Sequence, residues 1–196
     1  MSLNKEFYLT DYRLHQFGVY FVTFLWALIM PDILNYFGMQ VGTVAIDYYA
    51  EIHQSPINIY IHTIMLPISI GGYCLGVPAL FCLPPYWATL WRTSMYLMYF
   101  IHYFTINQCV AYVFLLIYGG SLYFAEKYYK NDWKTAVKGL AIAWGGVFYM
   151  EFIGHSLFET AQSRPEGVLN AILYSPYFTS QEIVTMGKLM LAPTSV

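Results

Sequence analysis

Four of the five histidines in this 196-residue chain, at positions 53, 62, 102 and 155, are candidates for one shared metal site. Histidine is the commonest metal ligand in proteins, and it binds through a neutral ring nitrogen. The three cysteines form no CxxC pair, which argues against a thiolate-bound structural zinc. Imidazoles joined by a carboxylate, with coordination positions left open, are typical of non-haem Fe(II) that activates oxygen.

Two carboxylates accompany the last of these histidines. Glu151, His155 and Glu159 follow one another at four-residue spacing, so on a continuous helix they share one face. A carboxylate one turn from a ligand histidine binds the metal itself or orients the ring through its second nitrogen, and the sequence leaves both roles open. A single histidine of this kind is more often an interfacial or helix-bridging residue than a ligand, so a metal site is indicated only where several of them converge.

The elements that must position these side chains are apolar helices. Hydrophobic residues make up 58% of the chain and charged residues 10%, whereas soluble domains carry about 25% charged residues. A bilayer-spanning helix needs about 20 mostly apolar residues. We therefore predict an all-α, polytopic transmembrane helical bundle with four to five spans, at about 17–34, 59–83, 86–104, 109–124 and 139–158. The segment 168–178 is too short to span and is expected at the membrane interface.

Following the chain through these spans brings the four histidines to one face of the membrane. His53 and His62 start the second span, His102 ends the third, and His155 ends the fifth. Pro56 disfavours helix at the residue before it, so a bend separates the first two. His15 falls on the opposite face.

Charge sets the orientation and excludes one class of partner. The loop between the last two spans carries Lys127, Lys130, Lys134 and Lys138, which favours a cytoplasmic loop with the histidines on the other side. Glu126 and Asp132 partly balance these lysines, so the side of the membrane that holds the site stays open. The net charge is −2 and no block of basic residues occurs, so nucleic acid is not an expected partner.

Two stretches of the chain carry a recognisable pattern. The segment from Tyr49 to Pro67 reads Y-x3-H-x2-P-x-N-x3-H-x4-P. The segment 152–165 reads F-I-G-H-x2-F-E and then R-P, and S-P-Y-F follows at 175–178. In this order the motifs resemble the 2-hydroxy fatty acid dioxygenase family, a membrane domain long catalogued without a function.

The resemblance implies an Fe(II)-dependent enzyme of the endoplasmic reticulum membrane. Its reaction would use O2 to remove one carbon from a 2-hydroxy fatty acid, in the alpha-oxidation that follows breakdown of hydroxylated sphingoid bases. The family's motif histidines map onto His53, His62 and His155, and its glutamate onto Glu159. Arg164 is a candidate to pair with the substrate carboxylate, although an arginine at a membrane edge more often reaches out to the lipid headgroups.

The chain departs from the family pattern at two positions, and its N-terminal part lies outside the resemblance. Gln54 stands where the family often has a second histidine, and Glu151 stands where it commonly has glutamine. His102 has no matching motif. The expected organisation is an N-terminal extension with one apolar segment (1–44), a membrane-embedded dioxygenase-like domain (45–180) and a polar tail (181–196).

Other readings of the same histidines remain open. Membrane desaturases and hydroxylases with two metals carry several HxxxH and HxxHH boxes, which five histidines without such a box exclude. A haem-binding protein with two axial histidines, or a lipid-binding protein whose histidines bridge helices, is the alternative to an oxygenase.

Overall fold

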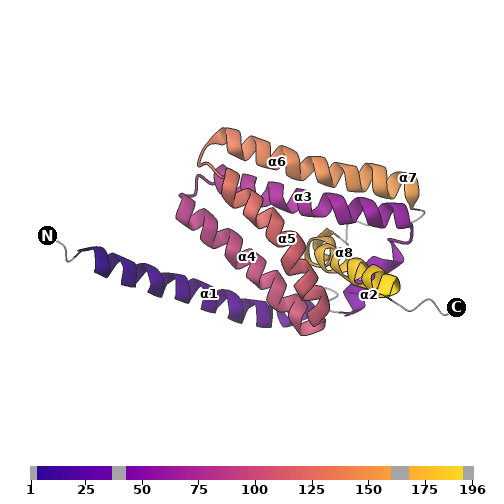
Figure 1. Cartoon of the computed structure of the whole chain (residues 1–196), viewed down its shortest axis with the longest axis horizontal. Helices are drawn as coiled ribbons and strands as arrows, with labels where there is room; N and C mark the ends of the chain where they lie inside the picture. Colours follow the sequence, from indigo (N-terminus) through magenta and orange to yellow (C-terminus); the bar gives the residue numbers. More distant parts are fainter. Residues whose placement is uncertain (1–3, 37–42, 160–167, 192–196) are drawn as a thin grey trace.

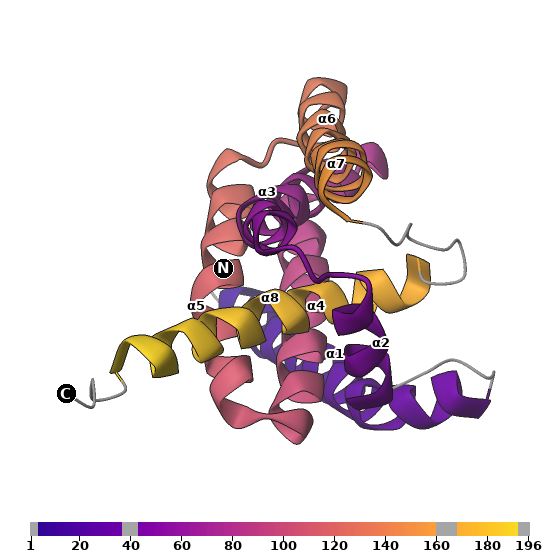
Figure 2. The same cartoon turned by 90° about the vertical axis from the view of Figure 1, so that its right-hand side faces the viewer.

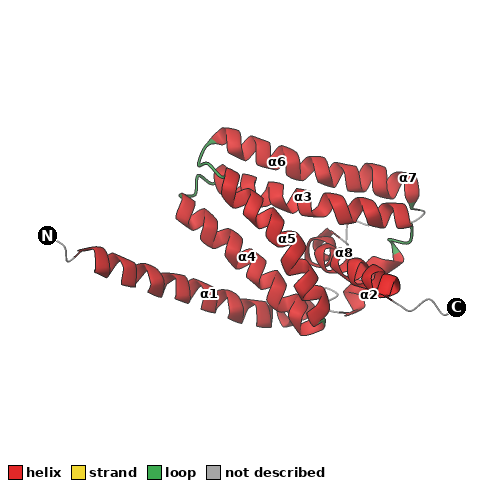
Figure 3. Cartoon of the chain, in the orientation of Figure 1, coloured by secondary structure: helices red, strands yellow, loops and turns green. Residues whose placement is uncertain are grey.

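The computed structural model describes residues 4–36, 43–159 and 168–191, and within these ranges the chain is helical with no strand (Figure 3). The predicted all-α class is confirmed. The elements in chain order are α1 (Asn4–Tyr36), α2 (Thr43–Glu51), α3 (Pro56–Leu80), α4 (Pro85–Ile106), α5 (Gln108–Tyr128), α6 (Trp133–Phe148), the π-helical segment η1 (Tyr149–His155), α7 (Ser156–Phe158) and α8 (Val168–Leu191).

Three helices in the described ranges are long and apolar enough to cross a membrane. They are Pro56–Leu80, Gln108–Tyr128 and Trp133–Phe158, where the last runs through α6, η1 and α7. They correspond to the second, fourth and fifth predicted spans. The first and third predicted spans lie in α1 and α4, which are helical but are not among these three. The count of four to five spans therefore stays a prediction.

Helices α3 and α6 pack closely side by side along their length (Figure 1). Glycines allow this approach: a Cβ added to Gly139 would lie 2.4 Å from the backbone nitrogen of Gly76 and 2.8 Å from the carbonyl oxygen of Gly72. The Ser69 hydroxyl also donates to the Ala143 carbonyl oxygen at 2.8 Å across the same seam. Small residues that let backbones meet are typical of helix packing within membranes. This seam fixes the position of η1, which continues α6, relative to α3.

Helix α8 runs crosswise to α3 and α6, as the two perpendicular views show (Figures 1 and 2). It extends to Leu191, so the predicted end of this segment at Phe178 was too early, and the helix enters the expected polar tail. Pro176 lies inside it and has no N–H to offer the carbonyl four residues earlier. That carbonyl, of Ile172, accepts a hydrogen bond from the Tyr99 hydroxyl of α4 at 3.0 Å instead.

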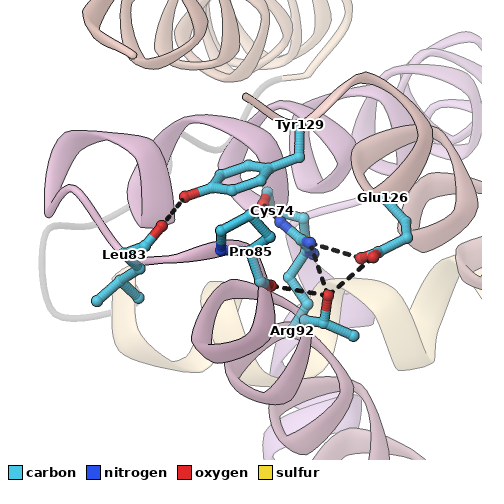
Figure 4. Close-up of polar contacts among 7 residues, drawn as sticks. Cys74, Leu83, Pro85, Arg92, Glu126 and Tyr129 are labelled. Carbon is cyan, nitrogen blue, oxygen red and sulfur yellow. Dashed lines mark hydrogen bonds and ion pairs between the residues drawn. The ribbon is translucent and has the colours of Figure 1, made fainter. Parts of the chain in front are cut away.

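A second proline, near the end of α3, also frees a helix carbonyl, and the buried Arg92 lies beside it (Figure 4). Pro78 leaves the Cys74 carbonyl without its helical partner, and Arg92 Nη1 donates to this oxygen at 3.4 Å. Arg92 also pairs with Glu126 at 2.5 Å and lies 4.7 Å from the centre of the Tyr129 ring. These contacts join α3, α4 and the end of α5.

We expect Glu126→Ala to lower the free energy of unfolding by about 2 kcal/mol, the scale of a hydrogen bond to a charged group. Arg92 is 1% exposed and would keep its charge, whereas Glu126 is 49% exposed, which limits the loss. Thermal unfolding in detergent measures the effect, with Lys134→Ala at an exposed position as the control. Equal stability of the two variants would contradict a stabilising role for the ion pair.

Candidate metal centre

Three of the four predicted histidines come together in the structure. His53 lies in the short linker between α2 and α3, His62 in the second turn of α3, and His155 at the end of η1. One ring nitrogen from each lies within 4.8 Å of the others. Their side chains are buried, with 3%, 3% and 7% exposed. This arrangement could hold one metal ion.

Backbone carbonyls fix the protonation of two of these rings. His53 Nδ1 lies 2.9 Å from the Tyr49 carbonyl oxygen, and His62 Nδ1 lies 3.0 Å from the Asn58 carbonyl oxygen. A carbonyl only accepts, so each Nδ1 carries the proton and donates it. In the neutral ring Nε2 then holds a lone pair. The two Nε2 atoms are 3.4 Å apart, so two lone pairs face each other, and a cation shared between them would remove that repulsion.

The third histidine brings a ring nitrogen that has no protein partner. His155 Nδ1 is buried and makes no hydrogen bond. Such an atom is costly to bury unless something binds it. Its ring centre lies 4.5 Å from that of His53 and 5.1 Å from that of His62. The donor set of three imidazoles therefore fits a divalent transition metal.

The surroundings of His53, in the linker between α2 and α3, keep its ring neutral, which is the form that binds metal. Burial and, to a lesser extent, the neighbouring His62 lower the pKa of His53 to about 3. His53 is consequently neutral at physiological pH. Binding a metal would displace no proton from its Nε2.

The predicted carboxylates do not join the group of three. Helix α7 ends at Phe158 and Glu159 is extended, so the expected shared helix face with His155 is wrong at this residue. The Glu159 carboxylate instead accepts hydrogen bonds from the Ser55 backbone nitrogen at 3.0 Å and from Asn58 Nδ2 at 2.9 Å. It thereby holds the start of α3, whose Asn58 carbonyl orients His62.

The remaining candidates lie elsewhere. Glu151 lies within η1 but does not belong to the group, and Arg164 lies outside the described residues. His102 is also outside the group: its Nε2 lies 3.2 Å from the Tyr174 hydroxyl. Tyr99 and His102, near the end of α4, both make hydrogen bonds to α8. His102 is therefore held by α8, although the count of spans placed it on the same face as the other three histidines. His15 makes a T-shaped ring contact with Trp87 at the start of α4 and does not belong to the group of three.

Tyr49 and Asn58 contribute to the centre although our sequence reasoning gave neither a role. Each precedes a histidine of the group by four residues, and each offers its carbonyl to that histidine's Nδ1. The Tyr49 ring also stacks on the His53 ring, with centres 3.9 Å apart and planes 14° from parallel. The repeated four-residue spacing was visible in the sequence and could have identified both.

Comparison with protein-family models, curated proteins and solved structures finds no match for this chain. The resemblance to the 2-hydroxy fatty acid dioxygenase family stays a prediction drawn from the motifs. The functional argument therefore depends on the geometry of the three histidines and the residues around them.

Proposed function

We propose that this protein is a membrane-bound, Fe(II)-dependent dioxygenase that removes one carbon from 2-hydroxy fatty acids. The observation that carries the proposal is the convergence of His53, His62 and His155, two of them with Nε2 lone pairs that face each other at 3.4 Å. Bound iron would supply the activation of O2. The residues of the chain would supply three neutral ligands in fixed orientations.

The choice of iron combines ligand chemistry with the motif resemblance. Imidazole ligands suit Fe, Zn, Cu and Ni, and three histidines around a metal with an open position also occur in zinc enzymes. The motifs around His53 and His155 resemble those of an Fe(II) enzyme, which selects iron from this group. Binding of Zn2+ with no turnover in the presence of Fe(II) would reverse that choice.

The charge of the donor set supports an anionic substrate. Three neutral imidazoles leave both charges of a divalent ion uncompensated, and Glu159 is engaged with Ser55 and Asn58. A charge in such a buried site is costly unless it is paired. A 2-hydroxy acid offers a carboxylate and a hydroxyl on adjacent carbons, so it supplies the missing charge and two oxygen donors together. Positioning the substrate in this way is a recognised contribution to catalysis.

The membrane location supports a fatty substrate. Beyond the three apolar helices, α1 exposes large apolar side chains on more than one face, among them Phe17, Val22, Phe24 and Trp26. A helix that is apolar all round is typical of a membrane span, so we include α1 and α4 in a bundle of four to five spans. The crosswise α8 suits the interface. We place the protein in the endoplasmic reticulum on the motif resemblance alone.

An apolar groove borders the helix that carries His62. It has a volume of about 230 Å3 and lies between α3 and η1, lined by Ile57, Tyr60, Ile61, Ile64, Met65 and Tyr149. Its lining residues belong to α3 and η1, the two helical segments that carry His62 and His155. In this proposal the acyl chain approaches the centre from the bilayer, where such apolar surface is freely accessible.

Turnover by the purified protein tests the proposal directly. With Fe(II) and O2, 2-hydroxypalmitate should give a product one carbon shorter, detected by mass spectrometry. Palmitate is the matched control, because it lacks the 2-hydroxyl and should give no shortened product. Absence of a shortened product from iron-loaded, folded protein would refute the dioxygenase function.

The haem alternative meets a steric objection. The rings of His53, His62 and His155 contact one another, with centres 4.5 to 5.1 Å apart, so no porphyrin fits between any two of them. We expect no Soret band from the protein as purified from cells. A lipid-binding protein without a metal would keep its lipid affinity when these histidines are removed, and would show no oxygen consumption.

A further inference from the structure

His53, which lies outside any helix, is held at two points by Tyr49. His53 lies in a non-helical linker, between the end of α2 and the start of α3. The Tyr49 carbonyl accepts from its Nδ1 at 2.9 Å, which fixes the tautomer. The Tyr49 ring lies flat on the imidazole, with centres 3.9 Å apart, which fixes the plane of the ring.

Tyr49 is anchored in turn by α8, which supplies no ligand. The Ser175 hydroxyl donates to the Tyr49 hydroxyl at 2.5 Å, and both side chains are buried. One turn further along α8, Phe178 contacts both rings, with centres 5.0 Å from Tyr49 and 5.6 Å from His53. The contacts therefore run without a gap from α8 through Tyr49 to His53.

We propose that Tyr49 and Ser175 are positioning residues for the metal centre, through which α8 sets the orientation of His53. The inference rests on the proposed metal-binding function. Groups that orient a ligand histidine through its second nitrogen typically affect metal affinity about 10- to 100-fold. Here the orienting group is a backbone carbonyl, which no side-chain substitution removes, so the stacked ring and its anchor are the parts open to mutation.

The chain provides a control that separates positioning from packing. Tyr118 is buried as Tyr49 is, and its hydroxyl shares a 2.8 Å hydrogen bond with Thr179 of α8. Its ring stacks on Phe114, with centres 4.8 Å apart, and none of its ring contacts is with the three histidines. Loss of this hydroxyl removes the same kind of bond to the same helix without touching His53.

Titration of the intact, detergent-solubilised protein with Co2+, followed by its visible absorption, measures the effect without turnover. We expect Tyr49→Leu to weaken metal binding about 10- to 100-fold. Tyr49→Phe keeps the stacked ring and Ser175→Ala keeps the phenol, so each should weaken binding about three- to tenfold, the scale of one hydrogen bond. The double variant should bind as weakly as either single variant, because both remove the same bond. Tyr118→Phe should bind as the unmodified protein does.

The two proposals fail in distinguishable ways. Unmodified protein that binds Co2+ while Tyr49→Leu binds it equally well would overturn the positioning role and leave the metal centre intact. Unmodified protein that binds no metal would overturn the proposed function. Positioning is then decided on metal-free protein, from the rate at which diethyl pyrocarbonate modifies His53. That rate should rise severalfold in Tyr49→Leu and stay unchanged in Tyr118→Phe, and equal rates in both would overturn the inference.

Discussion

His62→Ala and His155→Ala are each expected to weaken metal binding more than about 100-fold, because groups that merely orient a ligand are already worth 10- to 100-fold. Each substitution removes one of only three nitrogens in the described group. Oxygen-dependent shortening of 2-hydroxypalmitate should be lost at the same time. Metal content after dialysis and the Co2+ titration measure the first effect, and mass spectrometry of the product measures the second.

His102→Ala is the matched control for these variants. His102 and His62 are equally buried, with 3% of each side chain exposed, but His102 contacts Tyr174 instead of the other histidines. Its replacement should leave one metal ion bound per chain. Loss of metal in His102→Ala, or its retention in His62→Ala, would show that the three-histidine group is not the binding site.

Gly139→Ala is expected to destabilise the bundle by more than about 3 kcal/mol, above the usual range for overpacking. The added Cβ would lie 2.4 to 2.8 Å from backbone atoms of Gly76 and Gly72, which have no side chain that could move aside. Relief requires α3 and α6 to separate. Because η1 continues α6, this separation would also draw His155 away from His62, so metal affinity should fall together with stability.

Gly145→Ala provides the comparison on the same helix. A Cβ at Gly145 meets no atom within 4 Å, and alanine favours helix over glycine by about 1 kcal/mol. This variant should therefore unfold at the same temperature as the unmodified protein or slightly above it. Thermal unfolding and Co2+ titration of both variants measure the contrast. A Gly139→Ala protein of normal stability would show that the two helices do not pack through this seam.

The meeting of His53, His62 and His155 was predictable from the sequence, because it follows from counting apolar segments and noting which end of each carries a histidine. The bend between the first two was also predictable, since Pro56 excludes helix before it and indeed begins α3. The same count placed His102 at this face. It could not show that α8 lies between the end of α4 and the site, because that depends on a crosswise packing that no periodicity records.

The carboxylates were misplaced because of backbone geometry. Regular four-residue spacing keeps Glu159 on the face of His155 only if the helix continues. Instead it changes to a π-helical form at Tyr149 and ends at Phe158. Two glycines precede the π-helical segment, and Gly154 lies within it, which was the available signal that the helix there is irregular. The length of α8 was underestimated because the polar residues after Phe178 were interpreted as a tail, whereas the helix continues through them to Leu191. Pro176 does not end the helix, since Tyr99 satisfies the carbonyl that it frees.

The positions of the three histidines along the chain determine when the centre can form during synthesis. Two of its nitrogens emerge early from the ribosome and the third only after most of the chain has been made. An ion bound by all three histidines would close the long loop of chain between His62 and His155, and closing this loop has an entropic cost. Binding of an ion by all three histidines would therefore be a late step that needs η1, and a nascent chain that stops before His155 would lack the third nitrogen.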